Sequence, residues 1–208
     1  MFHLPTSRLV RKLSIAVWLM PAALGAQTLT PLTATYTKPG VGFTQYKQFK
    51  LLPLNVSDAR VVPPPWVESA DPHEWALIEE AREFLRSTFA QAVRQGIESG
   101  GKYKVVSEAT PGTLQLEVRL ISLTPWASRE EGPELSTRGS GTLTFEAHVR
   151  DARTAELLAV YQGTQQVGQD FQDNTMANKK ADLMQHFTTW GRDISQRLAT
   201  AQYEDDGR

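Results

Sequence analysis

Three histidines of the sequence, His73, His148 and His186, have side chains suited to general-base chemistry. A hydrolase of the Ser-His-Asp type would also need an exposed serine, and the sequence contains no Gly-x-Ser-x-Gly turn that would present one. His148 falls on the polar side of an alternating segment, and His186 lies beside the apolar stripe of a helical segment. We therefore expect solvated or edge-packed histidines and no catalytic residue.

Metal ligands are the next candidates. Asp170, Asp173 and Asn174 carry suitable oxygens, but their spacing lacks the alternation, the glycine and the bidentate glutamate of a calcium loop. His73 resembles the first ligand of a zinc-protease helix, yet Leu77 stands where the second histidine would be needed. We expect no metal site and no cofactor.

Paired carboxylates and glycine-rich turns offer two further chemistries. Glu130 and Glu131 are adjacent, whereas glycosidase chemistry needs two carboxyl groups facing each other across a cleft. The Gly139-Ser140-Gly141 segment precedes a strand pattern instead of leading from a strand into a helix, which disfavours a phosphate-binding loop. A hydrolase whose acidic residues meet only in the folded chain stays open as an alternative.

Composition narrows the class of protein. The 208 residues have a net charge of −1, and Arg8, Arg11 and Lys12 lie in an N-terminal segment without acids. Without those three, 19 basic residues face 23 acidic ones, a balance that argues against nucleic-acid binding. The absence of cysteine excludes disulfides, thiolate metal sites, a cysteine nucleophile and a lipid-modified cysteine.

The N-terminal segment has the layout of a secretory signal peptide. A basic region precedes an apolar run over residues 13–24, which is too short for a comfortable membrane span, and small residues follow. We expect a signal peptide over residues 1–26 with cleavage near Ala26, and a periplasmic or secreted product. A buried N-terminal helix is the competing interpretation, but Pro21 disfavours it. Residues 27–42, rich in Thr, Pro and Gly, predict a flexible leader.

The rest of the chain predicts one domain over residues 43–201 and a mobile tail over 202–208. Residues 55–62 favour a first strand, and Asp71, Pro72 and Glu74 have the pattern of a helix start. A three- and four-residue apolar period continues that helix to about residue 98. Strand patterns follow at 103–107, 114–120, 142–150 and 157–167, with a long polar connection at 124–138, a hairpin turn at 151–156 and a final helix from about 181 to 201.

This order of elements predicts an α+β fold. We expect a mainly antiparallel sheet of about five strands with two helices packed on one face.

Several motifs together resemble a known family. A Gly-Phe pair and a nearby Tyr open the domain at Gly42, Phe43 and Tyr46, and a Pro-Gly turn at Pro111 and Gly112 precedes a strand. An Asp-x-x-Thr-x-Glu hairpin precedes a Leu-Leu-Ala strand at 151–159. The final helix is aromatic and contains Phe187, Trp190 and Gly191. These features resemble the bacterial lipoprotein-type family catalogued as domain of unknown function 3313, DUF3313. The resemblance implies an envelope address and a fold, without an established activity.

The sequence departs from the family pattern at two places. Members usually carry a lipid-modified cysteine at the cleavage site, whereas Ala26 and Gln27 stand here, so a lipid anchor is not expected. Ala155 replaces the glycine of the hairpin, which predicts a different turn geometry.

Aromatic residues outside the regular stripes are the candidate partner contacts. Phe43, Tyr46, Trp66 and Trp126 could anchor another protein, because Trp and Tyr bury a large area at low entropic cost. The alternative is that they cover the sheet or a helix end. We expect a non-catalytic binding or assembly module that contacts an unidentified envelope or outer-membrane component through the leader or through residues 124–138. A periplasmic hydrolase and a small-ligand carrier are the alternatives.

Overall fold

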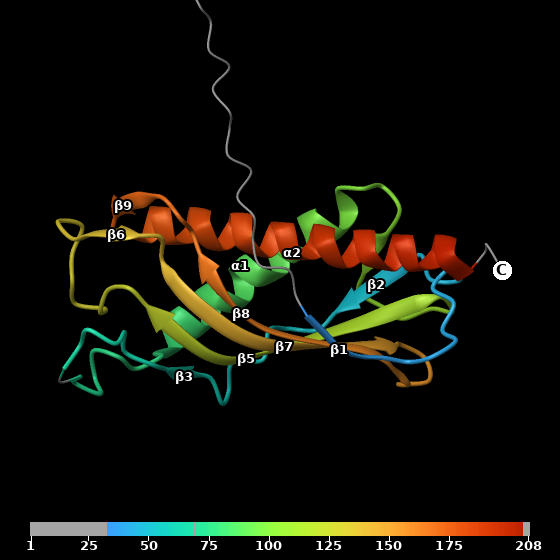
Figure 1. Cartoon of the computed structure of the whole chain (residues 1–208), viewed down its shortest axis with the longest axis horizontal. Helices are drawn as coiled ribbons and strands as arrows, with labels where there is room; N and C mark the ends of the chain where they lie inside the picture. The colour runs from blue at the N-terminus through green and yellow to red at the C-terminus, as the bar shows by residue number, and fades with distance from the viewer. Residues whose placement is uncertain (1–32, 69, 206–208) are drawn as a thin grey trace, which may run out of the picture.

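The computed structural model describes residues 33–68 and 70–205, with side chains up to residue 200. Two helices and a seven-stranded sheet form the body of the molecule, and a two-stranded sheet stands at one end (Figure 1). The elements in chain order are β1 Thr33–Thr37, β2 Gln48–Leu51, β3 Arg60–Val61, α1 Glu79–Glu98, β4 Lys104–Val106, β5 Thr113–Pro125, β6 Ser136–Arg138, β7 Gly141–Asp151, β8 Leu157–Val167, β9 Phe171–Asp173 and α2 Met176–Asp205.

The sheet is mixed, and this corrects the expectation of about five mainly antiparallel strands. Its order is β1-β8-β7-β5-β2-β4, and β3 also pairs with β5. The neighbours β1, β8, β7 and β5 are antiparallel, whereas β2 runs parallel to both β5 and β4, and β3 runs parallel to β5. The strands β2 and β4 are parallel because α1 lies between them in the chain and returns the chain to the same end of the sheet.

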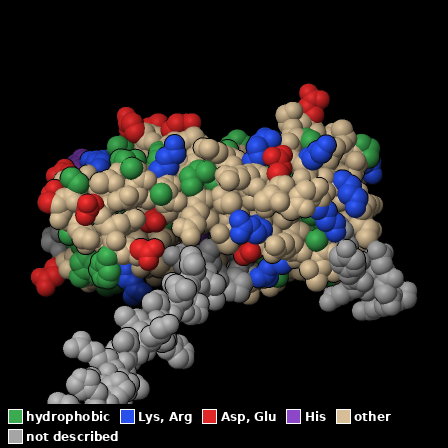
Figure 2. All heavy atoms as spheres, turned by 90° about the horizontal axis from the view of Figure 1, so that it is seen from above, with side chains coloured by type: hydrophobic (Ala, Val, Ile, Leu, Met, Phe, Trp, Pro, Cys, Tyr) green, Lys and Arg blue, Asp and Glu red, His purple; other side chains and the backbone are tan. Residues whose placement is uncertain are grey.

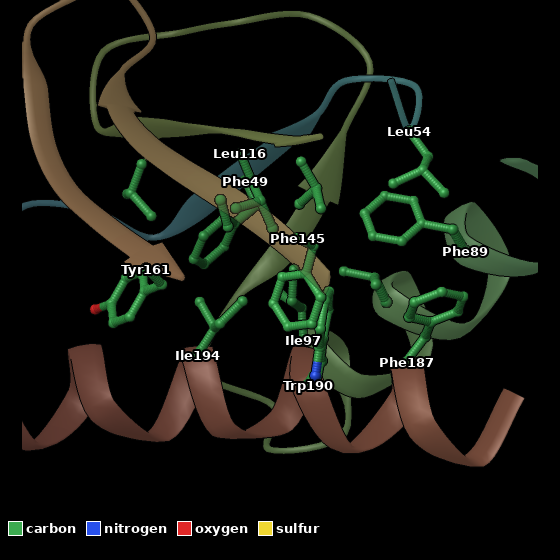
Figure 3. Packing of buried hydrophobic residues seen from close by; sticks show 14 of the residues in the cluster. Phe49, Leu54, Phe89, Ile97, Leu116, Phe145, Tyr161, Phe187, Trp190 and Ile194 are labelled. Atoms are coloured by element: carbon green, nitrogen blue, oxygen red, sulfur yellow. The ribbon is translucent and has the colours of Figure 1, made fainter. Parts of the chain in front are cut away.

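Alternation along the long strands separates the two faces of the sheet. In β5, Leu116, Val118 and Leu120 are buried, whereas Glu117 and Arg119 point to the opposite face. The buried side chains of the strands meet those of both helices in one hydrophobic cluster, which places the helices on a single face. Figure 3 shows Phe145 of β7 against Trp190 of α2, and Phe89 of α1 against Phe187 of α2.

Both helices begin at other residues than the sequence predicted. The Asp71 side chain accepts a hydrogen bond from the backbone amide of His73, so it stabilises a separate turn, and α1 begins only at Glu79. Ile78 takes the N-cap position without a side-chain cap. The final helix begins at Met176, five residues before the expected start, because Thr175 caps it through a hydrogen bond from the Asn178 amide.

The ends of the domain are more regular than expected. Residues 33–37, expected to be flexible, form the edge strand β1, and α2 continues to Asp205 through part of the expected mobile tail. The signal peptide predicted for residues 1–26 lies outside the described residues. Within the described ranges, no helix has the length and apolarity needed to cross a membrane.

The hairpin between β7 and β8 is held by Asp151. Its carboxylate accepts hydrogen bonds from the amides of Arg153 and Thr154 and from the Tyr46 hydroxyl, at 2.8–2.9 Å. Burial, and then the neighbouring Asp151, raise the pKa of Tyr46 to about 12. Ala155 has a φ of 60°, so it adopts the left-handed conformation that glycine would favour. The replacement of glycine by alanine therefore does not require the change of turn geometry that the sequence led us to expect.

The two helices touch backbone to backbone. A Cβ atom at Gly96 of α1 would lie 2.1 Å from the carbonyl oxygen of Thr188 in α2, and one at Gly191 would lie 2.5 Å from the carbonyl oxygen of Val93. No side chain fits at either position without moving a helix. The glycine pair therefore sets how closely α1 and α2 approach each other.

Replacing Gly96 by alanine is expected to lower the free energy of unfolding by about 2 kcal/mol or more, although alanine favours helices, because the added methyl group overpacks the helix contact. Urea denaturation measures the change. Gly100→Ala is the matched control, since a Cβ atom at Gly100 would have no other group within 4 Å, and it should change stability by less than about 0.5 kcal/mol. Equal effects of the two substitutions would contradict this account of the helix contact.

Candidate functional site

An apolar cleft of about 320 Å³ lies where α1 and α2 begin. Its walls come from residues 74–85, the end of β5 with the residues after it, the start of β7, the end of β8 and the first two turns of α2. Most of these side chains are apolar, including Trp75, Leu77, Phe84, Leu123, Leu143 and Leu183. We call this feature the apolar cleft.

The cleft follows from the way the helices are arranged. Gly96 and Gly191 bring α1 and α2 together near the C-terminal end of α1, and Phe89 and Phe187 fill the space before it, with ring centroids 5.3 Å apart. Beyond these rings, residues from the N-terminal parts of both helices line the cleft. The late start of α1 contributes too, because residues 74–78 form a wall instead of a helical turn.

Four charged side chains line the apolar cleft. Glu80 and Arg129 are exposed to solvent, and Glu74 is half-buried. Lys179 is also half-buried, and burial lowers the pKa of its ammonium group, while the charge of Glu131 raises it by less. The face that carries α2 mixes both signs of charge and shows no continuous basic area (Figure 2).

The four aromatic residues predicted to contact a partner divide into two groups. Phe43 and Tyr46 are only 2% and 3% exposed and belong to the hydrophobic core, so they offer no area to a partner. Trp66 is 63% exposed and packs against the half-buried Trp126, with ring centroids 5.3 Å apart and ring planes tilted by 41°. This tryptophan pair adjoins the apolar cleft in the chain, because Trp126 lies between Pro125 and Ala127, which both line it.

A polar cleft of about 310 Å³ lies on the opposite face of the sheet, lined by Asn55, Asp58, Glu117, Arg119, Glu146 and His148. The Oε1 atom of Glu146 lies 2.9 Å from Nε2 of His148 and 3.3 Å from Nη2 of Arg119. Although burial raises the pKa of Glu146, the hydrogen bond from Gln162 and these two neighbours lower it below its ordinary value. Glu146 is therefore held ionised, which disfavours a role as a general acid.

His186 is a core residue and not the edge-packed one that the sequence predicted. It is 2% exposed, and neither ring nitrogen has a hydrogen-bond partner among the described residues. Its ring packs against Phe187 and Trp190, and burial lowers its pKa from 6.5 to about 4. A histidine in this setting is neutral at pH 7 and out of reach of a substrate.

The oxygen-bearing residues near β9 have structural contacts. Asn174 is buried and its side-chain amide donates to the backbone oxygen of Glu131, which ties β9 to the segment after β5. Across the described ranges, no group of three or more His, Cys, Asp or Glu side chains is arranged to hold a metal ion. The apolar cleft was missed by the sequence analysis, since no motif marks it and its walls come from separate segments.

Comparisons with known proteins give a family and distant structural likenesses. The model of the family described as "protein of unknown function (DUF3313)" matches residues 24–194. No curated protein matches the chain. A solved structure from Xanthomonas campestris with the family model DUF330 is 15% identical, with a TM-score of 0.46, over 85% of this chain and 97% of that one. The PelC dodecamer of Paraburkholderia phytofirmans is 9% identical, with a TM-score of 0.37, over 81% and 95%.

The burial of His186 predicts a pH dependence of stability. The pKa of His186 is lower in the folded chain than in the unfolded chain, so below pH 6.5 the unfolded chain binds a proton that the folded chain does not. The free energy of unfolding therefore falls between pH 6.5 and about 4. From pH 7 to pH 5, this group is expected to cost roughly 2 kcal/mol.

Urea denaturation of the His186→Leu variant should lack this loss, whereas His73→Leu, at an exposed position, should keep it. The same fall in stability for wild type and His186→Leu would refute the assignment.

Proposed function

The chain belongs to the DUF3313 family, and we propose that it is an exported, non-catalytic binding protein whose binding site is the apolar cleft. The single observation that carries this proposal is the lining of the cleft, in which apolar side chains from both helices and four strands, β3, β5, β7 and β8, converge around about 320 Å³. Clefts of this size and character are typical of sites for small apolar ligands or for an apolar group of a larger partner.

The chemistry of the walls favours binding over catalysis. Among the described residues that line the apolar cleft there is no histidine or cysteine, and the hydroxyl of Ser140 already donates to the Asp182 carboxylate at 2.6 Å. The contact between His148 and Glu146 supports the alternative, a hydrolase acting at the polar cleft. The contacts of Glu146 with Arg119 and Gln162 favour a structural role for this carboxylate instead.

Export is the part of the proposal that rests on sequence alone. The basic, apolar and small-residue order of residues 1–26 supports a signal peptide, with a periplasmic or secreted location after its removal. In that setting, an apolar cleft serves either as the site of a carrier for a small ligand or as a contact with an envelope component.

The tryptophan pair supports a partner surface beside the cleft. Trp66 leaves most of its area exposed, and exposed aromatic area is costly in water unless something covers it. We propose that Trp66 and Trp126 contact an envelope protein or outer-membrane component.

A pull-down from envelope extract is expected to lose its specific partner on Trp126→Ala, because the substitution removes one of the two packed tryptophan rings. Phe171→Ala is the control, since Phe171 is a 78% exposed aromatic residue on β9 outside the pair. An unchanged set of recovered proteins with Trp126→Ala would speak against this surface.

Filling the apolar cleft is expected to abolish ligand binding. Ala81 of α1 lines the cleft, so Ala81→Phe should weaken the binding of the neutral fluorescent probe N-phenyl-1-naphthylamine by about tenfold or more. Ala90→Phe, at an exposed position of the same helix, is the control and should bind the probe as the wild type does. The proposal fails if the wild type does not bind the probe, or if both variants bind it equally well.

A further inference from the structure

Lys179 is the half-buried cation on the wall of the apolar cleft. Met176, Lys179 and Leu183 follow one another along one side of α2 at three- and four-residue steps, and all three line the cleft. Lys180, the next residue, is exposed and does not line it. The two adjacent lysines therefore differ in whether they face the cleft.

The position of Lys179 is unfavourable for a cation without a counter-ion. Within the described part of the chain, no carboxylate forms an ion pair with its ammonium group, and Glu131 exerts only the lesser of two effects on its pKa. Burial removes water from this ammonium group. Lys179 also lies in the first turn of α2, where the helix dipole disfavours positive charge and the first turn contains no acidic residue.

Among the described residues that line the cleft, neither the half-buried Glu74 nor the exposed Glu80 forms an ion pair with Lys179. The Ser140 hydroxyl is engaged with Asp182, and the carboxylate of Glu80 extends at an exposed position of α1. The wall around Lys179 is otherwise formed by apolar side chains such as Met176 and Leu183. A ligand that complements this wall combines an apolar body with one negative charge at its end.

We propose that the apolar cleft binds an amphiphile, with its hydrocarbon chain among the apolar side chains and its anionic head, a carboxylate or a phosphate, paired with Lys179. This inference rests on the proposed binding function of the cleft and adds the chemical class of the ligand. The pairing relieves both unfavourable features of Lys179, because the anion replaces lost water and offsets the dipole of α2.

Four ligands with the same alkyl chain test the charge of the head: laurate, dodecyl phosphate, dodecanol and dodecyltrimethylammonium, each titrated calorimetrically below its aggregation concentration into the full-length chain at neutral pH. The two anions are expected to bind roughly tenfold or more tightly than dodecanol, and the cation more weakly than dodecanol. The tighter of the two anions distinguishes a fatty-acid source from a phosphate-headed lipid.

Lys179→Gln is expected to bring the affinity for the anions down to that of dodecanol while leaving dodecanol binding unchanged, which also shows that the variant is folded. Lys180→Gln is the matched control and should keep the preference for anions. Equal binding of anions and dodecanol by the wild type, or an undiminished preference in Lys179→Gln, would overturn the role of Lys179 while leaving the proposed function intact. Failure of every ligand to bind would overturn both.

Discussion

The direct contact between α1 and α2 at Gly96 and Gly191 is the constraint on which the rest of the structure depends. The two helix backbones lie so close here that a single added methyl group would collide with the other helix, and both helices therefore fit side by side over one face of the sheet. Because the closest contact lies near the end of α1, space remains between the helix starts. Phe89 and Phe187 fill part of that space, and the apolar cleft occupies the rest.

The sheet gives the molecule two chemically different surfaces from the same strands. In β5, Leu116, Val118 and Leu120 face the helices, whereas Glu117 and Arg119 line the polar cleft on the other side. Because side chains alternate between the two faces of a strand, one strand contributes to both surfaces. A shift of the strand register by one residue would exchange the apolar and polar side chains between the faces. On the polar side Glu146 contacts Arg119 and His148, whereas on the apolar side Lys179 forms no ion pair among the described residues.

Sequence patterns predicted the long elements well and the short ones only in part. Alternation located β5, β7 and β8, and the apolar period located both helices, because these signals repeat within one segment. The strand predicted at 103–107 is present as β4, and of the strand predicted at 55–62 only β3 forms. The strand β2 was missed, because four residues are too few for a period and its parallel partners lie far away in the chain. Asp71 has the sequence of a helix cap, but its turn ends before α1 begins, since local capping signals do not specify how far a helix extends.

The sequence by itself determined the α+β class, the two amphipathic helices, the absence of a recognisable catalytic motif and the likeness to DUF3313. Each of these depends only on local residue spacing or on short motifs. Only the tertiary structure decided that the sheet is mixed, that Phe43, Tyr46 and His186 are core residues, and that Trp66 meets Trp126. The apolar cleft belongs to the second group as well. Its walls come from segments that are distant in the chain, and burial of a residue such as Lys179 depends on what those segments place around it.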